Sequence, residues 1–258
     1  NSATANALQT VAVGARNDLK VTAVAGAVAI SATVGVGAGA DIQVISEIEN
    51  ERILGILNGK LKKPFPYGYV SDLGSGSGRI EKMNIAVLSR IAAESVKEVD
   101  FGLLAGPGRP TRGLVRATFD LGDNHALVIY GAHFKSNFGD RNKNYSQRAN
   151  TMSILLTDVS TLFNEFPDRK WEIMLVGDFN TDPLLREFDD DPTLKVLPKW
   201  VDLWNEHPDK ASLFTVITRR GDPTREFPPA LFDRILVHPD MKAKPWATDL
   251  PQVVEKGT

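Results

Sequence analysis

The sequence predicts a layered α/β fold, and three features of the chain indicate it. Short runs rich in β-branched and aromatic residues alternate with segments whose apolar residues recur every three or four positions. The 258 residues are 42% hydrophobic and 24% charged, a composition that can bury a large core. No internal repeat or linker interrupts this pattern, so we expect residues 1–258 to form a single domain.

The expected strands are Ile42 to Ser46, Met83 to Leu88, Leu114 to Phe119, Ala126 to Ala132, Glu172 to Val176 and Leu231 to Val237. The clearest helix begins near Ser146 and ends at Pro167, because apolar residues follow at helical spacing: Met152, Leu155, Val159, Leu162 and Phe166. The segments LGSGSGR and GPGRP are expected to be exposed loops, since neither is followed by the Gly-Lys-Ser/Thr of a phosphate-binding loop.

The longest uncharged run, Val21 to Ala40, contains only Val, Ala, Gly, Thr, Ser and Ile. Its length would suffice for a membrane span, but it has no Leu or aromatic residue and four Gly, so we expect no stable span. The preferred interpretation is a buried strand from Leu19, then a loop and a helix of poor propensity. The apolar strand in DIQVISEIEN follows.

Charge and cysteine content exclude several classes of function. The net charge of −2 and pI of about 6.1 exclude a protein held on DNA by bulk positive charge. The absence of Cys excludes disulfides, thiolate catalysis and Cys-zinc sites. The first residue is Asn1 rather than Met, which indicates processing or trimming. We expect a monomer and favour a secreted or periplasmic location.

Polar residues collect where apolar strands end. Glu47 follows a strand in VISEIEN, His133 follows LVIYGA, and Asp178 and Asn180 follow EIMLVG, while Asp233 lies within ALFDRILV. The ends of strands at one edge of a sheet are where α/β enzymes assemble active sites. Mg²⁺ needs only one or two carboxylates with water and substrate phosphate, so the other residues could handle water, phosphate and leaving group. This set of residues suits phosphoester hydrolysis.

Structural interpretations remain open for several of these residues. Glu47 could begin a helix, where its charge would favour the N-terminus, and His133 could be a satisfied histidine at a strand end. Asn180 and Asp182 could cap a helix that has Pro183 at its first position.

Asp233 needs a partner if it is buried, because an unpaired carboxylate is costly to remove from water. Arg234 points to the opposite face of the same strand. His125, His207 and His238 lie in turn-like contexts and are expected to be solvated. No partner for Asp233 is therefore evident from the sequence.

Together these residues resemble the endonuclease/exonuclease/phosphatase superfamily, which is deoxyribonuclease I-like. The resemblance covers about Asp41 to Val237 and is carried, in order, by ADIQVISEIEN, MNIAVLSR, LVIYGAHFKS with YSQRAN following, LVGDFNTDP and LFDRILV. It implies an α/β fold of four layers, in which two packed, mostly antiparallel or mixed β-sheets are flanked by helices.

The resemblance also implies roles for the polar residues. Glu47 would be the ligand of Mg²⁺, with Mn²⁺ as an alternative ion, and His133 would lie on the phosphate side. Asp178 would orient or deprotonate the attacking water, with Asn180 as its partner on water or phosphate. Asp233 would orient a second, C-terminal histidine. Catalytic roles thus fall to His133, Asp178, Asn180 and Asp233.

The implied activity is divalent-metal-dependent phosphodiester hydrolysis by a nuclease-like enzyme, with nucleic acid among the candidate substrates. Two alternatives are a phosphomonoesterase or sphingomyelinase-type hydrolase and an inactive member that binds phosphorylated ligands or proteins. The runs KLKKPF and RNKNYSQR could border a nucleic-acid groove or be solvated faces. Arg148 could brace the site, contact phosphate, or lie solvated on the helix surface.

Two features depart from the family pattern. Members usually carry an Asn near the end of the first strand, whereas no Asn occurs here between Asn17 and Asn50. The family also ends in a Ser-Asp-His motif, which does not occur before Thr258. We expect the natural protein to continue beyond Thr258 with such a segment, forming a further catalytic strand.

Overall fold

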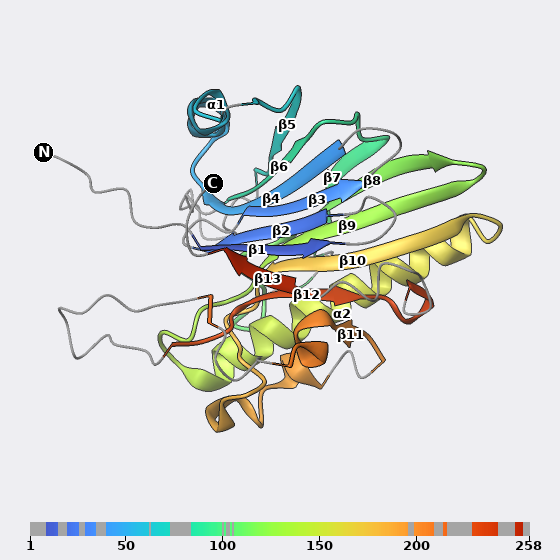
Figure 1. Ribbon diagram of the computed structural model, residues 1–258. Helices are drawn as coiled ribbons and strands as arrows, with labels where there is room; N and C mark the ends of the chain where they lie inside the picture. Colours follow the sequence, from blue (N-terminus) through green and yellow to red (C-terminus); the bar gives the residue numbers. More distant parts are fainter. Residues whose placement is uncertain are drawn as a thin grey trace, which may run out of the picture.

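Two β-sheets pack face to face, with a helix outside each of them (Figure 1). The helix α1 (Glu51–Gly59) lies against the seven-stranded sheet, and α2 (Arg141–Glu165) crosses the outer face of the six-stranded sheet. The predicted four-layer arrangement is therefore confirmed. This computed structural model describes residues 9–14, 20–25, 29–34, 40–61, 63–72, 84–99, 101, 104, 106–195, 199–208, 214–215, 229–241 and 251–254.

Neighbouring strands of the seven-stranded sheet are all antiparallel, in the order β13 (Pro251–Val254), β1 (Gln9–Gly14), β2 (Lys20–Ala25), β3 (Ala29–Val34), β4 (Ala40–Ile48), β6 (Asn84–Ser89) and β5 (Tyr67–Val70). The six-stranded sheet has the order β11 (Val201–Asp202), β12 (Asp233–Val237), β10 (Lys170–Asp178), β9 (His125–His133), β8 (Leu114–Gly122) and β7 (Ser95–Glu98). It is mixed, because β9 and β10 run parallel. Short 3-10 helices follow β10 and β12 at Arg186–Phe188, Pro192–Leu194, Leu203–Glu206 and Pro239–Met241.

The helix expected within Val21 to Ala40 is wrong. This part of the chain forms β2 and β3, an antiparallel pair in which Val24 lies opposite Ala29 and Lys20 opposite Thr33. Val, Ile and Thr are stiff at the first side-chain torsion, which lowers helix propensity and suits a pleated strand. The run therefore adds two strands between β1 and β4.

The core between the sheets is made by the inward-facing residues of both, including Ile42, Val44, Ile85, Val87, Ile129, Val176 and Ile235. Gly131 of β9 lets the sheets approach closely here. A Cβ atom at this position would lie 2.7 Å from Val44 Cγ1 and 3.0 Å from Ile85 Cγ2, so any larger residue would push the sheets apart.

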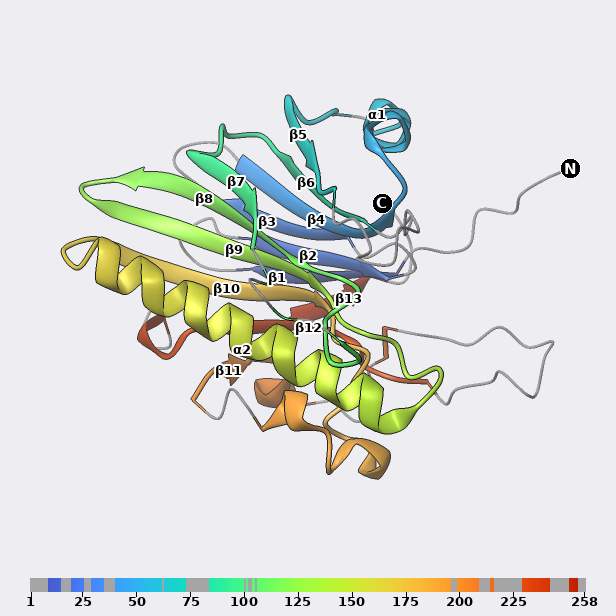
Figure 2. The ribbon, with the colours of Figure 1, turned by 180° about the vertical axis from the view of Figure 1, so that it is seen from behind.

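The helix α2 begins five residues before the expected start near Ser146. Asp140 caps it, because its side chain accepts a hydrogen bond of 2.7 Å from the Lys143 backbone N–H. Figure 2 shows α2 lying along β9 and β10. The predicted apolar stripe, Met152, Leu155, Val159 and Leu162, packs there with buried residues of both strands. Phe166 is not part of this stripe: it follows the helix and is 48% exposed. None of the described helices is long and apolar enough to cross a membrane.

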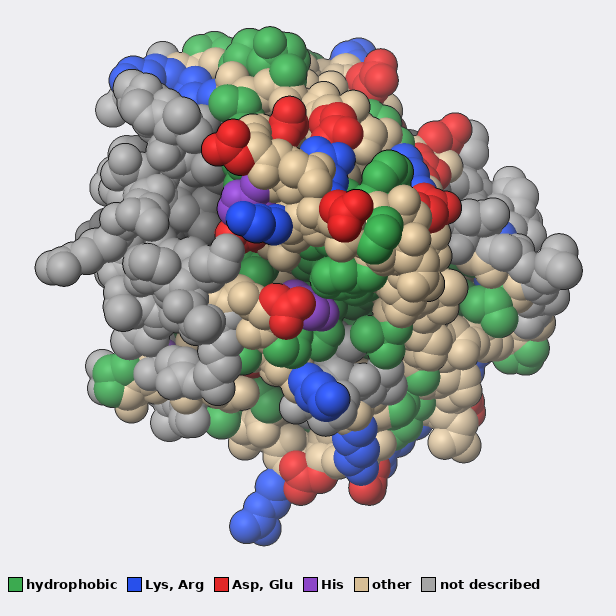
Figure 3. Space-filling view, turned by 90° about the vertical axis from the view of Figure 1, so that its right-hand side faces the viewer, with side chains coloured by type: hydrophobic (Ala, Val, Ile, Leu, Met, Phe, Trp, Pro, Cys, Tyr) green, Lys and Arg blue, Asp and Glu red, His purple; other side chains and the backbone are tan. Residues whose placement is uncertain are grey.

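The two ends of the sandwich differ in character. Figure 3 shows the end that carries the turn between β8 and β9, where acidic and basic side chains surround an apolar centre. The mixture agrees with the net charge of −2, and the described residues visible at this end form no extended basic surface. The strands β9 and β10 run away from this end and terminate at His133 and Asp178. The candidate catalytic residues therefore gather at the opposite end.

Candidate active site

Three neighbouring strands bring His133, Asp178 and Asp233 into one row. Asp178 of β10 lies opposite His133 of β9 on one side and opposite Asp233 of β12 on the other. Residues at the same register position point to the same face of a sheet. Val176 and Ile235, two positions away on β10 and β12, lie in the core between the sheets. The row of three side chains therefore faces the seven-stranded sheet.

Glu47 reaches this row from the facing sheet. The register of β4 shifts between Ile45 and Ile48, and Glu47 within this bulge has a φ of 62°. A bulge redirects a side chain, and here it brings Glu47 Oε1 to 3.6 Å from His133 Nε2 while leaving the Glu47 side chain 47% exposed. The helix α1 starts later, with Asn50 as its cap, so the interpretation that Glu47 begins a helix is wrong.

The turn after β10 is shaped by two local features. Gly177 has a φ of 137°, and a Cβ atom there would lie 2.0 Å from the backbone oxygen of Ala132, so only glycine fits. Asp178 Oδ1 then accepts a hydrogen bond of 2.7 Å from the Asn180 backbone N–H, which holds Asn180 at a φ of 51°. The Asn180 side chain donates to the Phe134 carbonyl oxygen at 3.1 Å, tying the turn to β9.

The helix-capping interpretation of Asn180 and Asp182 is wrong. Asp182 accepts from the Leu184 N–H at 2.8 Å with one oxygen and from the Leu231 N–H at 2.7 Å with the other. These bonds form a turn and join it to the segment before β12, and the next helical element begins only at Arg186. Asp182 therefore supports the turn that carries Asp178.

Arg112 is a functional candidate that the sequence did not reveal. Its Nη1 atom lies 2.6 Å from His133 Nε2 and donates to the Phe134 carbonyl oxygen at 2.9 Å. The preceding segment GPGRP was expected to be an exposed loop, but Pro110 is buried. Side chains of α2 hold that segment, since Gln147 and Asn150 donate to the carbonyl oxygens of Arg109 and Gly108, each at 2.7 Å. The segment LGSGSGR lies outside the described residues.

The pKa values of the side chains in the row are shifted, because these ionisable groups lie close together and are removed from water. Burial raises the pKa of Asp178 to about 7, and Glu47 adds to this rise, while the Asn180 N–H and the Arg112 guanidinium oppose it. Burial, helped by the charges of Asp178 and Glu47, raises the pKa of Asp233 well above its ordinary value. Burial and then Arg112 lower the pKa of His133 to about 3, so this imidazole is neutral at pH 7.

Asp233 is 1% exposed, and its Oδ1 atom has no hydrogen-bond partner among the described residues. Its backbone N–H donates to the Thr215 hydroxyl at 2.9 Å, and its carbonyl oxygen accepts from Trp204 Nε1 at 3.0 Å. The strand β12 begins at Asp233 rather than at Leu231, where the sequence predicted its start. The carboxylate thus lies buried at the start of the strand, next to Asp178.

The remaining histidines are not solvated as expected. His125 Nε2 lies 2.8 Å from Glu172 Oε1, with 27% of its side chain exposed. The ring of His238 packs between Phe163 and Trp200, with centroid distances of 5.5 and 5.4 Å, and burial lowers its pKa. His207 is half-buried beside a tryptophan ring, at 6.2 Å between centroids.

Arg148 is 1% exposed, so the interpretation that it is solvated on the helix surface is wrong. Its Nη1 atom donates to the Lys135 carbonyl oxygen at 2.7 Å and to Asn137 Oδ1 at 2.9 Å, and its Nη2 atom contacts the buried Asp191. These contacts join α2 to the loop after β9 and to the segment after β10. Arg148 braces the two loops that flank the row.

The acidic side chains at the row offer oxygen atoms, which are the ligands that hard divalent cations prefer. Within the described ranges, no three His, Asp or Glu side chains converge closely enough to form a complete metal site. Mg²⁺, however, keeps several waters and takes one or two carboxylates from the protein. The half-exposed carboxylate of Glu47 and that of Asp178, together with the unpartnered oxygen of Asp233, are donors of this kind. These oxygens suit a hydrated divalent cation.

Comparisons with solved structures agree with the fold described above. The fold resembles sphingomyelinase C from Streptomyces griseocarneus, with 15% identity, a TM-score of 0.56 and coverage of 78% of this chain and 72% of that chain. It resembles a truncated TDP2 from Caenorhabditis elegans, with 18% identity, a TM-score of 0.52 and coverage of 76% and 70%. It also resembles a beta toxin from Staphylococcus aureus, with 16% identity, a TM-score of 0.52 and coverage of 77% of this chain and 72% of that chain.

Sequence comparison extends this likeness beyond the fold. No curated protein sequence matches the chain at a significant level. Residues 15–254 do match the Endonuclease/Exonuclease/phosphatase family, which is named for enzymes that hydrolyse phosphoester bonds. This match spans most of the chain and includes every residue of the row. The protein belongs to the endonuclease/exonuclease/phosphatase family.

Proposed function

We propose that this protein is a divalent-metal-dependent phosphodiester hydrolase whose active site is the row His133, Asp178 and Asp233 with Glu47 and Arg112. The observation that carries the proposal is the convergence of these side chains from two sheets and a loop. A structural core has no use for two adjacent aspartates whose pKa is raised by burial and, further, by neighbouring acidic charges. A phosphodiesterase needs such groups to hold a cation and to activate water.

Asp178 is the proposed general base. A pKa of about 7 places it where a carboxylate can accept a proton from water and still be partly ionised at neutral pH. The turn fixes its orientation, because one carboxylate oxygen is held by the Asn180 N–H and the other points toward His133. Asn180 shapes this turn and is the proposed partner of Asp178 on water or phosphate.

Arg112 is the proposed phosphate-binding cation, and His133 its positioning partner. His133 is 1% exposed and its Nε2 atom faces Arg112, so the neutral imidazole accepts a hydrogen bond from the guanidinium. Arginine offers several donors in one plane, which allows contact with His133 and phosphate together. His133 therefore acts on the phosphate side by holding Arg112 in position.

Asp233 completes the site as the second buried carboxylate beside Asp178. Its position and its raised pKa favour a shared proton between the two groups in the absence of a cation. Its unpartnered oxygen is suited to orient a hydrogen-bond donor near the substrate. A divalent cation, when bound at Glu47, would neutralise charge on the phosphoryl oxygens and lower the pKa of water.

Hydrolysis should therefore require a divalent metal. We expect EDTA to abolish turnover of bis-p-nitrophenyl phosphate and added Mg²⁺ or Mn²⁺ to restore it. Glu47→Gln should raise the Mg²⁺ concentration for half-maximal rate by about 10-fold or more, because it removes a ligand charge. Asp168→Asn is the matched control, because Asp168 is exposed and lies just after the C-terminal end of α2. This variant should leave the dependence of the rate on Mg²⁺ concentration unchanged. Full activity in EDTA would rule out the metal site.

Arg112→Gln should lower kcat/KM for the same substrate by about 10²-fold, the usual effect of losing one donor to a developing phosphoryl charge. Arg112→Lys should recover part of this loss, since it restores charge but not the planar fork. Arg109→Gln is the control, because Arg109 lies in the same loop and donates instead to the Leu104 carbonyl oxygen at 2.8 Å. Equal losses in both variants would mean that the loop, and not the Arg112 charge, matters.

A further inference from the structure

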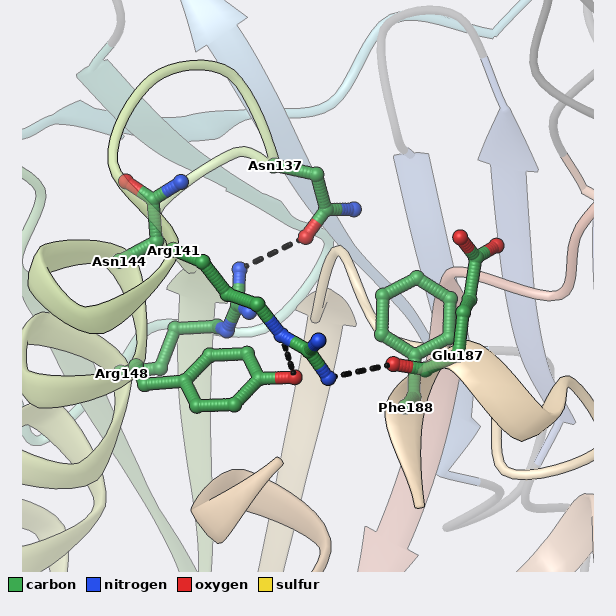
Figure 4. A pocket seen from close by; sticks show the side chains of 7 residues that line it. Asn137, Arg141, Asn144, Arg148, Glu187 and Phe188 are labelled. Atoms are coloured by element: carbon green, nitrogen blue, oxygen red, sulfur yellow. Dashed lines mark hydrogen bonds between the residues drawn. The ribbon is translucent and has the colours of Figure 1, made fainter. Parts of the chain in front are cut away.

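A cavity of about 240 Å³ lies between the first turns of α2 and the 3-10 helix Arg186–Phe188 (Figure 4). The proposed hydrolytic steps make no use of it. Its lining consists of Asn137, Arg141, Asn144, Tyr145, Arg148, Glu187 and Phe188. Pockets that enclose a drug-sized ligand measure about 300–1,000 Å³, so this cavity suits a single ring system.

The cavity adjoins the row of catalytic candidates through Asn137. The Asn137 side chain donates to the Asn180 carbonyl oxygen at 2.8 Å, within the turn that follows Asp178. Its Oδ1 atom accepts from Arg148 Nη1 at 2.9 Å (Figure 4). One amide group therefore touches both the catalytic turn and the cavity wall. A ligand in the cavity would therefore lie against a residue that is bonded to the turn after Asp178.

Flat side chains form the wall of the cavity. The guanidinium carbons of Arg141 and Arg148 lie 5.0 and 5.4 Å from the centroid of the Tyr145 ring. Arg141 is fixed in place because its Nε atom donates to the Tyr145 hydroxyl at 2.7 Å and its Nη2 atom to the Glu187 carbonyl oxygen at 3.2 Å (Figure 4). Aromatic rings and guanidinium planes are the surfaces on which unstacked nucleobases bind.

Polar groups at the cavity suit a neutral ring better than a polyanion. The charge of Arg148 is balanced by the buried Asp191, and Asp190 and Asp191 lie near enough to Arg141 to interact with its charge. Arg148 is 1% exposed, and its Nε atom has no hydrogen-bond partner among the described residues. Asn137 and Asn144 line the cavity with amide groups that are held in place, since their side-chain nitrogens donate to the carbonyl oxygens of Asn180 and Phe138. The chain as a whole has a net charge of −2, so bulk charge does not hold a ligand here.

We propose that this cavity binds one nucleobase of a single-stranded polynucleotide, adjacent to the phosphate that is cleaved. The proposal rests on the proposed function and names its substrate class. A base must leave the stack to enter the cavity, and unstacking costs least in a single strand. Single-stranded oligonucleotides are therefore better substrates than duplexes of the same sequence.

The first test compares an octathymidylate with bis-p-nitrophenyl phosphate, which lacks a base. Tyr145→Ala should lower the ratio of the two kcat/KM values by about 10-fold, because stacking on one aromatic ring is worth about one power of ten or more. Tyr145→Phe keeps the ring but loses the hydroxyl that accepts from Arg141, so it should retain most of the ratio and separates stacking from that hydrogen bond. Lys143→Ala removes an exposed cation of the same helix that does not line the cavity, and should also retain it. An unchanged ratio in Tyr145→Ala would overturn the proposal.

The second test needs no turnover, so it separates this proposal from the proposed function. Fluorescence anisotropy measures binding of labelled octathymidylate to Asp178→Asn and to Asp178→Asn with Tyr145→Ala. The double variant should bind about 10-fold more weakly, and the duplex should bind more weakly than the single strand. Equal binding by the two variants would overturn the nucleobase site. Turnover of sphingomyelin vesicles that depends on Tyr145, without cleavage of the oligonucleotide, would do so as well.

Discussion

Replacing Asp178 by Asn should lower turnover of bis-p-nitrophenyl phosphate by about 10³-fold, within the 10²- to 10⁴-fold contribution of a positioned base. The change is nearly isosteric, and the Asn side-chain oxygen can still accept the Asn180 N–H. The turn should therefore survive while the proton acceptor is lost. An unaffected rate would show that Asp178 only shapes the turn.

The same variant has a second expected effect, on stability. Because the pKa of Asp178 is raised from 3.8 to about 7, the folded protein binds its proton more tightly than the unfolded chain does. The free energy of unfolding of the wild-type protein therefore falls as pH rises from about 4 to 7. Asp178→Asn has no titrating group at this position, so its free energy of unfolding does not fall for this reason. Measured in EDTA, the Tm of the variant relative to wild type should increase across this range and then level off. A constant difference would contradict the raised pKa.

Arg148→Met should destabilise the protein by about 3–5 kcal/mol, because it leaves the buried Asp191 without a cation. For a chain of this size that loss corresponds to a fall in Tm of about 6–20 °C. The double variant Arg148→Met with Asp191→Asn should recover part of it, since Asn can still accept the 2.9 Å hydrogen bond from the Thr193 N–H.

A surface ion pair provides the control for this prediction. Lys195 lies 3.8 Å from Asp190, and both side chains are mostly exposed, so Lys195→Met should leave the unfolding free energy unchanged. Chemical denaturation of the four proteins measures the differences. If the double variant is no more stable than Arg148→Met, the loss comes from the Lys135 and Asn137 oxygens in the loop after β9 and not from the unpaired charge of Asp191.

The sequence predicted those parts of the site that lie at the ends of regular strands. His133 and Asp178 are the last residues of β9 and β10, where an apolar run changes abruptly to polar residues. Glu47 and Asp233 also lie in strands that their apolar neighbours made recognisable. The local sequence pattern was sufficient for these residues, because each is a polar side chain within or at the end of an apolar strand.

Residues that reach the site from loops could not be predicted in this way. Arg112 precedes β8 in a segment rich in Gly and Pro, and only the pairing of β8 with β9 brings it beside His133. Asn137 likewise acquires its position from contacts with Asn180 and Arg148, which are distant in sequence. Positions fixed by long-range contacts leave no periodic signal in the sequence.

The error over Val21 to Ala40 has a different origin. Gly and Ala dilute the alternation of larger residues there, so the strand period is weak, and the expected α/β alternation favoured a helix. In the structure, the order β1, β2, β3 and β4 is a simple antiparallel succession. Neighbouring strands in sequence need no helix between them when they run antiparallel.

The most direct test of the account is the initial rate of bis-p-nitrophenyl phosphate hydrolysis in four samples measured side by side. These are the wild-type protein with Mg²⁺, the wild-type protein with EDTA, and Asp178→Asn and Asp168→Asn with Mg²⁺. We expect turnover by the wild-type protein and Asp168→Asn with Mg²⁺, and background rates in the other two. Equal rates in all four would contradict metal-dependent hydrolysis at the row. Absence of turnover in all four, with DNA as well, would favour a protein that binds phosphorylated ligands without cleaving them.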